Sequence, residues 1–254
     1  MRTFVQLRRL MDSNRDLARK IARKHGALPA TDCAEIAGKV DVASVAVPTQ
    51  HHFGVASALL DAGIHVLVEK PLTPTLEEAD ALVAAAEARG LELRVGHLER
   101  FNPALMAVRD RIVRPRFMEC HRLAPFKPRS TDVDVVLDLM IHDIDIILSL
   151  VPAEVAEVRA SGVPVLTDSV EIANARIEFT DGCVANVTAS RVSAKSMRKL
   201  RVFQPDTYVS IDFESRECAV ARKLPGEGRD GMPKIDHQLR RFAQGDSLEA
   251  ELRA

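Results

Sequence analysis

Two polar residues stand four positions apart in a segment that is otherwise apolar. In "DLMIHDID", Asp138 and His142 would lie on one face of a helix, where a carboxylate and an imidazole could meet the same ligand. Asp145 lies near that face. The surrounding segment, 135–150, is apolar nearly all round, which predicts a buried helix whose Asp and His need partners. The alternative is a helix whose charged face is merely solvated.

A lysine marks the end of the apolar run "IHVLVE". Glu69, Lys70 and Pro71 follow this predicted strand. Ligands of parallel sheets bind at the carboxyl ends of the strands. A buried Asp, a buried His and a strand-end Lys could transfer protons, because burial and mutual charge shift pKa values towards neutrality. Lys70 could instead be an ordinary solvated residue at a strand end.

The first hundred residues alternate between strand and helix patterns, as parallel strands joined by crossover helices do. A capping box from Thr75 to Glu78 starts one predicted helix, and Gly26, Gly63 and Gly90 end three of them. This order predicts a doubly wound parallel sheet. Strands are expected at 4–12, 42–48, 64–69 and 91–96, and helices at 15–26, 51–63 and 75–90. The strand at 42–48 is expected to be short and buried.

The second half changes period. Residues 171–192 alternate apolar and polar around an Asp181-Gly182 turn, with Ala173, Ala175, Ile177 and Phe179 on one face. Residues 199–222 repeat the pattern around a turn near 205–206. The prediction is an α/β chain with an incomplete parallel sheet over 1–100 and, over 101–254, an α/β domain with an open, mostly antiparallel sheet.

The composition of the chain argues against nucleic acid and membranes as binding partners. Lys and Arg number 35 against 36 Asp and Glu, so the net charge of −1 gives no basic footprint for nucleic acid. No run approaches the roughly 20 apolar residues that span a bilayer, and the first residues do not resemble a signal peptide, so we expect a cytoplasmic protein with a small-molecule partner. No metal site is expected, and the widely spaced cysteines are read as buried free thiols: Cys33, Cys120, Cys183 and Cys218.

Four motifs in order resemble the Gfo/Idh/MocA family of nicotinamide-dependent sugar oxidoreductases. They are "LMDSNRDLARKIARKHG", "VAVPTQHH", "AGIHVLVEKPLT" and "DLMIHDID". The resemblance implies a Rossmann domain, NAD as the cofactor, and oxidation of a sugar hydroxyl. The segment "GHLERFNPA" most resembles the branch of the family that oxidises the 3-hydroxyl of UDP-N-acetylglucosamine, a nucleotide sugar.

The resemblance also implies roles for individual residues. Asp12 would bind the adenosine ribose and favour NAD over NADP. His142 would remove the hydroxyl proton, and Asp138 would orient the imidazole of His142. Lys70 would stabilise the alkoxide, or could itself be the base. Arg100 and Arg129 could bind the anionic part of the substrate or simply be solvated. The residues expected to line the cofactor site are Pro48, Thr49, His52, Glu69 and Lys70.

The sequence departs from the family pattern at both ends. It contains no G-x-G-x-x-G turn, and the first strand and helix, together with a late helix, are expected to be missing. The absent strand is central in the sheet, so its loss would leave unpaired backbone between two neighbours. The chain could be a truncated dehydrogenase, a non-catalytic sugar-nucleotide binding or regulatory module, or one completed by another chain. The family's exposed antiparallel sheet further suggests a homo-oligomer.

Overall fold

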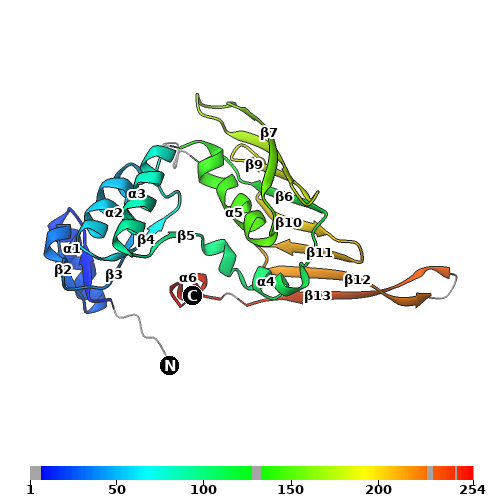
Figure 1. The fold of residues 1–254 in the computed structure, drawn as a ribbon, viewed down its shortest axis with the longest axis horizontal. Helices are drawn as coiled ribbons and strands as arrows, with labels where there is room; N and C mark the ends of the chain where they lie inside the picture. The colour runs from blue at the N-terminus through cyan, green and yellow to red at the C-terminus, as the bar shows by residue number, and fades with distance from the viewer. Residues whose placement is uncertain (1–6, 128–132, 228–230, 244, 254) are drawn as a thin grey trace. The chain divides into compact units, whose positions relative to one another are not determined.

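The chain divides into two compact units, residues 1–96 and 97–252. The computed structural model describes residues 7–127, 133–227, 231–243 and 245–253. Each unit has its own apolar core. Figure 1 labels the elements that are described below.

The first unit is built from parallel strands and the helices that connect them. Asn14 caps the first helix by accepting from the N–H groups of Asp16 and Leu17, and Thr75 caps α3 by accepting from Glu78. The expected helix stops at Gly26 and Gly90 are confirmed, since both adopt left-handed backbone after the last helical residue. The elements are β1 Arg9–Met11, α1 Arg15–His25, β2 Leu28–Ala30, η1 Cys33–Glu35, β3 Val42–Val45, η2 Thr49–His51, α2 His52–Asp61, β4 His65–Glu69, α3 Leu76–Arg89 and β5 Leu93–Gly96.

The parallel strands of this unit form two separate sheets. β1 pairs with β2, and β3, β4 and β5 form a second sheet in that order. Among the described residues, no strand joins the two sheets. The prediction that 42–48 forms a buried strand was wrong, because Val42 is 61% exposed. β3 is an edge strand of this sheet, and every second side chain along it is exposed to solvent.

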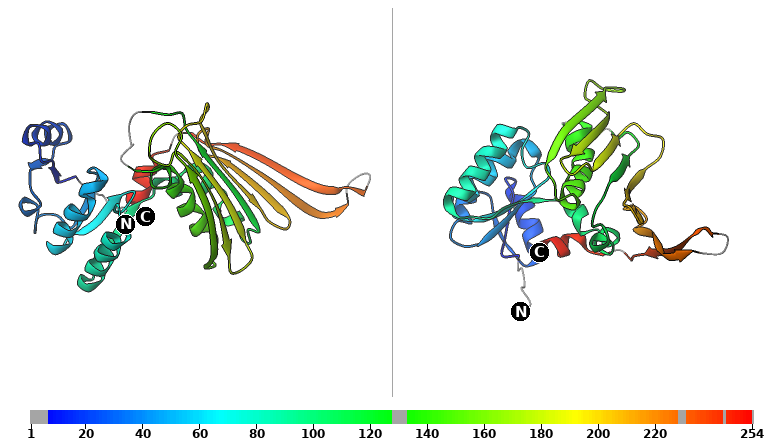
Figure 2. Two further views of the ribbon diagram at one scale, coloured as in Figure 1. Left: turned by 90° about the horizontal axis from the view of Figure 1, so that it is seen from above. Right: turned by 45° about the vertical axis from the view of Figure 1, so that its right-hand side comes forward.

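The second unit is dominated by a sheet of eight strands in the order β13-β12-β11-β10-β6-β9-β8-β7. All neighbours are antiparallel except β6 and β9, which run parallel. Figure 2 shows α5 against one face of this sheet. The strands are β6 Phe117–Leu123, β7 Val155–Val163, β8 Ile172–Phe179, β9 Val184–Ser190, β10 Met197–Phe203, β11 Thr207–Asp212, β12 Glu217–Glu227 and β13 Pro233–Arg241; the helical segments are η3 Leu98–Phe101, α4 Pro103–Met106, η4 Arg109–Arg111, η5 Val136–Met140, α5 Ile141–Leu150 and α6 Ser247–Leu252.

Alternating side chains of the sheet fill the core of the second unit. The predicted face of β8 is confirmed: its apolar members are between 3% and 6% exposed, and Gly182 makes the turn to β9 with φ 81°. Arg122 on β6 is also buried, at 3% exposed, although it carries a full charge. Arg122 therefore places a buried cation among the apolar side chains of the inward face, and that cation needs compensation.

The helix that carries the Asp138 and His142 pair is not regular. Asp134 caps its start through the N–H groups of Val136 and Leu137. Residues Val136–Met140 then form a π-turn, before α5 begins at Ile141. A π-turn holds more residues per turn than an α-helix, so the simple four-residue alignment expected for the pair does not apply here.

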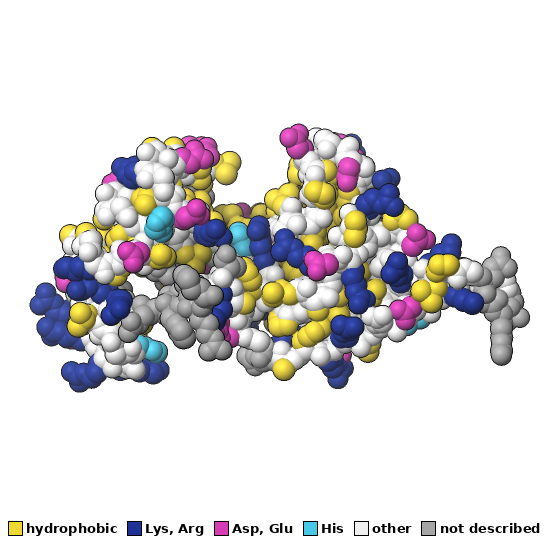
Figure 3. All heavy atoms as spheres, turned by 60° about the horizontal axis from the view of Figure 1, so that its bottom comes forward, with side chains coloured by type: hydrophobic (Ala, Val, Ile, Leu, Met, Phe, Trp, Pro, Cys, Tyr) yellow, Lys and Arg dark blue, Asp and Glu magenta, His cyan; other side chains and the backbone are white. Residues whose placement is uncertain are grey.

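Surface charge is uneven in the first unit. Figure 3 shows Lys and Arg side chains gathered at the end of the molecule formed by α1, whose last turn contains Arg23, Lys24 and His25. Arg23 and Lys24 lie where the negative end of the helix dipole favours cations. In the described part of the chain, no helix has the length and apolar character needed to cross a membrane.

Candidate active site

The carboxyl ends of three parallel strands bring four predicted residues to one edge of the sheet. Register pairs Val45 with Val68 and Glu69 with Gly96, so β3, β4 and β5 end side by side. Pro48 and Thr49 follow β3, and Glu69 and Lys70 end or follow β4. Lys70 is half-buried. This is the edge at which open α/β sheets bind ligands.

His52 has a different environment from the one expected. It is 2% exposed, and its Nδ1 and Nε2 lie 2.8 Å from the carbonyl oxygens of Pro71 and Val47. The side chain therefore bridges the loop after β3 and the loop after β4 instead of lining an open channel. A neutral imidazole donates through one ring nitrogen, so His52 can hydrogen-bond one of these carbonyl oxygens while it packs against the other, between the two loops that carry Thr49 and Lys70.

Asp12 provides a carboxylate at the end of β1. Its Oδ1 accepts from the backbone N–H of Asn14 at 2.8 Å, which orients the carboxylate just beyond Met11. An acidic residue at the end of the second strand of a dinucleotide-binding sheet is positioned for a ribose diol. Asp12, Thr49 and Lys70 therefore bring a carboxylate, a hydroxyl and an amino group to strand ends of this unit, and the sequence contains no G-x-G-x-x-G turn.

Asp138 and His142 both lie in the second unit and are both half-buried. The expectation that these two residues take the buried polar positions of the helix was wrong. The buried ones are Asp143 and Asp145, at 3% and 8% exposed. α5 packs against β6, β9 and η3, and the two buried carboxylates face these elements.

Asp143 belongs to an ion-pair cluster that the sequence reasoning missed. Arg122 donates from Nε and Nη2 to Asp143, at 3.1 and 2.8 Å, and from Nη1 to Glu99 at 3.2 Å. Its guanidinium also lies 5.9 Å from the ring centre of Phe213. We call Arg122, Asp143 and Glu99 the inner clamp. Burial raises the pKa of Asp143, and the charge of Arg122 opposes that rise.

Asp145 holds the arginine that sequence reasoning offered as a phosphate ligand. Arg100 donates from Nε to Oδ2 at 2.6 Å and from Nη2 to Oδ1 at 2.5 Å. The hydrogen bond to Asp145 raises the pKa of Arg100. His97 Nε2 lies 3.6 Å from Oδ1 of the same carboxylate. We call the pair of Arg100 and Asp145 the outer clamp.

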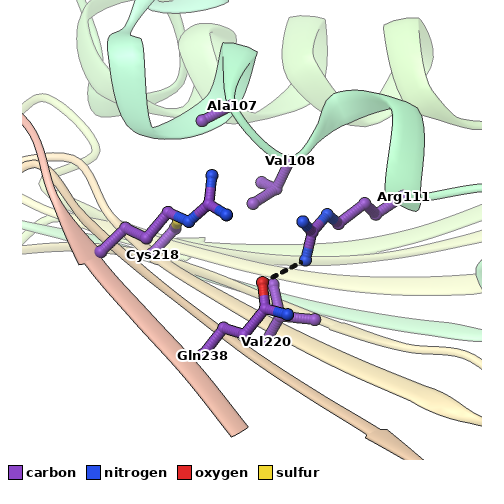
Figure 4. A pocket seen from close by; sticks show the side chains of 7 residues that line it. Ala107, Val108, Arg111, Cys218, Val220 and Gln238 are labelled. Atoms are coloured by element: carbon purple, nitrogen blue, oxygen red, sulfur yellow. Dashed lines mark hydrogen bonds between the residues drawn. The ribbon is translucent and has the colours of Figure 1, made fainter. Parts of the chain in front are cut away.

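A surface hollow in the second unit lies apart from both clamps. A small hollow between α4, β12 and β13 is partly closed by a hydrogen bond from Arg111 to Gln238, and it contains none of the predicted site residues (Figure 4). Among the described residues, no group of three His, Cys, Asp or Glu side chains could hold a metal ion. Arg129 lies outside the described residues.

A parallel sheet with polar residues at its carboxyl edge, followed by a large mixed sheet, is the arrangement of a dinucleotide-binding α/β unit joined to a second domain. Two family models match: an oxidoreductase family with an NAD-binding Rossmann fold over residues 1–97, and a Gfo/Idh/MocA C-terminal domain over residues 109–207. The chain belongs to the Gfo/Idh/MocA family. It is a dehydrogenase whose cofactor is NAD.

Similar proteins agree with this assignment. A UDP-N-acetylglucosamine 3-dehydrogenase from Acidithiobacillus ferrooxidans is 40% identical over 97% of this chain and 79% of its own length. Its solved structure gives a TM-score of 0.88 at 38% identity, with 97% and 78% of the two chains covered. A myo-inositol dehydrogenase from Streptomyces leeuwenhoekii is 31% identical over 67% of this chain and 55% of its own. A levoglucosan dehydrogenase structure, at 22% identity and TM-score 0.80, covers 91% of this chain and 70% of its own and shares the fold.

Replacing His52 tests its role as a bridge. We expect His52→Ala to lower the free energy of unfolding by about 1–3 kcal/mol, because buried carbonyl oxygens lose a hydrogen-bond donor. NAD binding should weaken as well, since both loops loosen. Urea unfolding and a fluorescence titration with NADH measure the two effects. The matched control is His51→Ala, an adjacent but exposed imidazole, which should change neither. Equal losses in both variants would contradict the bridge.

Replacing Arg122 tests the inner clamp. We expect Arg122→Met to cost about 3–5 kcal/mol of unfolding free energy, because Asp143 would remain buried without its cation. Adding Asp143→Leu should recover most of that loss. Arg89→Met, which breaks an exposed pair with Asp61, is the control and should cost no more than about 1 kcal/mol. Urea denaturation of wild type, Arg122→Met, the double variant and Arg89→Met measures these free energies of unfolding. No recovery in the double variant would show that packing, and not charge, causes the loss.

Proposed function

We propose that the protein oxidises the 3-hydroxyl of a nucleotide sugar, with UDP-N-acetylglucosamine as the substrate. The similarity to the UDP-N-acetylglucosamine 3-dehydrogenase carries this proposal, because 40% identity extends over 97% of the chain and therefore includes both units. The fold agrees along the same length, at a TM-score of 0.88.

The proposed chemistry converts a secondary alcohol to a ketone. The hydroxyl proton goes to the imidazole of His142, acting as general base, while the C–O bond becomes a double bond. NAD supplies the hydride acceptor for the hydrogen on the same carbon. Asp138 is proposed to orient the imidazole, and the ammonium group of Lys70 to stabilise the alkoxide as charge develops.

The proposed cofactor contacts come from the first unit. Asp12 accepts hydrogen bonds from the ribose hydroxyls through Oδ2, and a carboxylate there disfavours the 2′-phosphate of NADP. Pro48, Thr49 and Glu69 line the cofactor site at the edge formed by β3 and β4. We propose that His52 acts on this site through the loops that it bridges.

The substrate's diphosphate needs cationic partners. Arg129 remains our proposal for this role, because a guanidinium can bind phosphate through paired donors. Arg100 was proposed for the same role, but two of its nitrogens donate to Asp145. A phosphate would therefore have to bind at its remaining nitrogen or displace the carboxylate.

We also propose that the protein is cytoplasmic and forms a homo-oligomer through the sheet face opposite α5. On that face, Phe203 lies between Phe117 and Tyr208, with ring centres 5.7 and 5.1 Å away. Charges beside this aromatic row are paired, as in Arg201 with Glu119 at 2.9 Å. An apolar row flanked by paired charges is suited to burial against a second copy.

Turnover tests the proposed reaction. Mixing the protein with NAD and UDP-N-acetylglucosamine should produce NADH, and reduction of the product with borodeuteride should place deuterium at carbon 3. We expect Lys70→Ala and His142→Ala to lower kcat by about 10²–10⁴-fold, the usual contribution of such groups. Lys24→Ala and His25→Ala, exposed at the end of α1, are the controls. Near-full turnover in both site variants would contradict the assigned roles. Sugar-nucleotide binding without NADH formation would instead indicate a binding module.

Disrupting the aromatic row tests the oligomer. We expect Phe203→Glu to shift sedimentation towards the monomer, because a buried carboxylate without a partner opposes association. Leu76→Glu is the control, since Leu76 is 79% exposed on α3 of the other unit, and it should leave the sedimentation coefficient unchanged. A wild-type protein that stays monomeric at all concentrations would contradict the proposal.

A further inference from the structure

We propose that Arg100 and Asp145 are positioning residues for His142: the outer clamp, acting with the inner clamp, fixes the rotation of α5 about its own axis. This inference rests on the proposed role of His142 as the base. Neither clamp residue needs to touch the substrate for the effect. The outer clamp would act through the helix on which His142 is placed.

The two clamps hold α5 from different sides. At 3.6 residues per turn, successive side chains are separated by about 100° around a helix. With His142 as the reference, Asp143 then lies about 100° to one side and Asp145 about 60° to the other. His142 therefore projects from the arc between the two anchored carboxylates. A single anchor would leave the helix able to rotate about it, whereas two anchors on different sides prevent this.

Both clamps end on the same short segment. Arg100 of the outer clamp and Glu99 of the inner clamp are neighbours in η3. η3 is itself held by α6, where the Ser247 hydroxyl donates to the Phe101 carbonyl oxygen at 3.2 Å. The carboxylates of α5 are thus fixed against a segment that has support of its own.

The backbone on the N-terminal side of His142 is not a regular α-helix. At the first residue of α5, the Ile141 N–H donates to the Val136 carbonyl oxygen of the π-turn. π-turns are rare insertions that interrupt the regular ladder and are frequent at functional sites. Side-chain anchors must therefore supply the rotational precision that a continuous α-helix would otherwise give to residue 142.

The outer clamp can be tested without unfolding the protein. The side chain of Arg100 is 42% exposed, so its charge remains solvated in Asp145→Asn, which makes this the cleaner variant. Arg100→Gln, in contrast, leaves the carboxylate of Asp145, 8% exposed, without its arginine. Arg122 is 3% exposed, and breaking the inner clamp would bury an unpaired charge. The outer clamp is therefore the part of the device whose loss can be seen in catalysis and not only in stability.

The experiment compares Asp145→Asn, Arg100→Gln and their double variant with wild type, using NAD and UDP-N-acetylglucosamine. We expect each single change to lower kcat by about 10-fold or more, because small misplacement of a reacting group is costly. KM for both substrates should stay within about twofold, and the double variant should be no slower than the worse single one. Arg100→Lys keeps the charge but not the two-pronged contact, and should fall between Arg100→Gln and wild type.

The control is Arg89→Gln. Arg89 pairs with Asp61 at 2.5 Å and is also 42% exposed, so it matches Arg100 in exposure and partner type. It should not change kcat. A loss of thermal stability with unchanged kcat in the clamp variants would overturn the proposal. So would a rise in KM for the nucleotide sugar in Arg100→Gln alone, because that result would make Arg100 a substrate ligand.

A second readout separates this inference from the proposed function. Hydrogen exchange of the peptide amides over 136–150 should accelerate in Asp145→Asn and Arg100→Gln and stay unchanged in Arg89→Gln. This measurement needs no substrate. If wild type does not oxidise the sugar, the proposed function fails, while exchange still decides whether the clamp holds α5. Unchanged exchange in the clamp variants would overturn the clamp even in an active enzyme.

Discussion

The burial of one positive charge organises the second unit. Arg122 points into the core from a strand whose other inward side chains are apolar, and a guanidinium remains charged there. The charge can be accommodated only if carboxylates are brought to it, and these come from α5 and from η3. The positions of a helix and of a loop segment therefore follow from a single cation. Such a pair is weak as a source of net stability, but its geometry is demanding.

The first unit is organised by backbone hydrogen bonds instead. The parallel ladder sets where β3, β4 and β5 end, and this places the residues after them at one edge whatever their side chains are. Asp12 reaches its position from a separate two-stranded sheet. Backbone pairing alone thus places a carboxylate, a hydroxyl and an amino group at strand ends of this unit.

Sequence reasoning predicted the features that arise from periodicity and local turns. Gly26, Gly90 and the Asp181-Gly182 turn ended elements where expected, because left-handed backbone and turn geometry are local properties. It did not predict the edge exposure of β3 or the parallel pairing of β6 with β9, because both depend on which strands become neighbours. The π-turn was missed for another reason: the residues of 136–140 are compatible with a regular helix, and only the hydrogen-bond ladder distinguishes the two.

The clusters around α5 show where a single sequence stops being informative. The helix was expected to be buried, and its polar residues were expected to need partners, which is correct as a general requirement. Which of its three acids and one histidine would be buried depended on the sides that face β6, β9 and η3. The partners, Arg122 and Glu99, are 21 and 23 residues away from their contacts, and nothing in their local sequence indicates a buried charge. Backbone ladders tolerate exchange of side chains and leave a repeating pattern. A buried ion pair is specified by individual side chains and leaves none, so the part of the site that is most sensitive to substitution is also the part that the sequence pattern shows least.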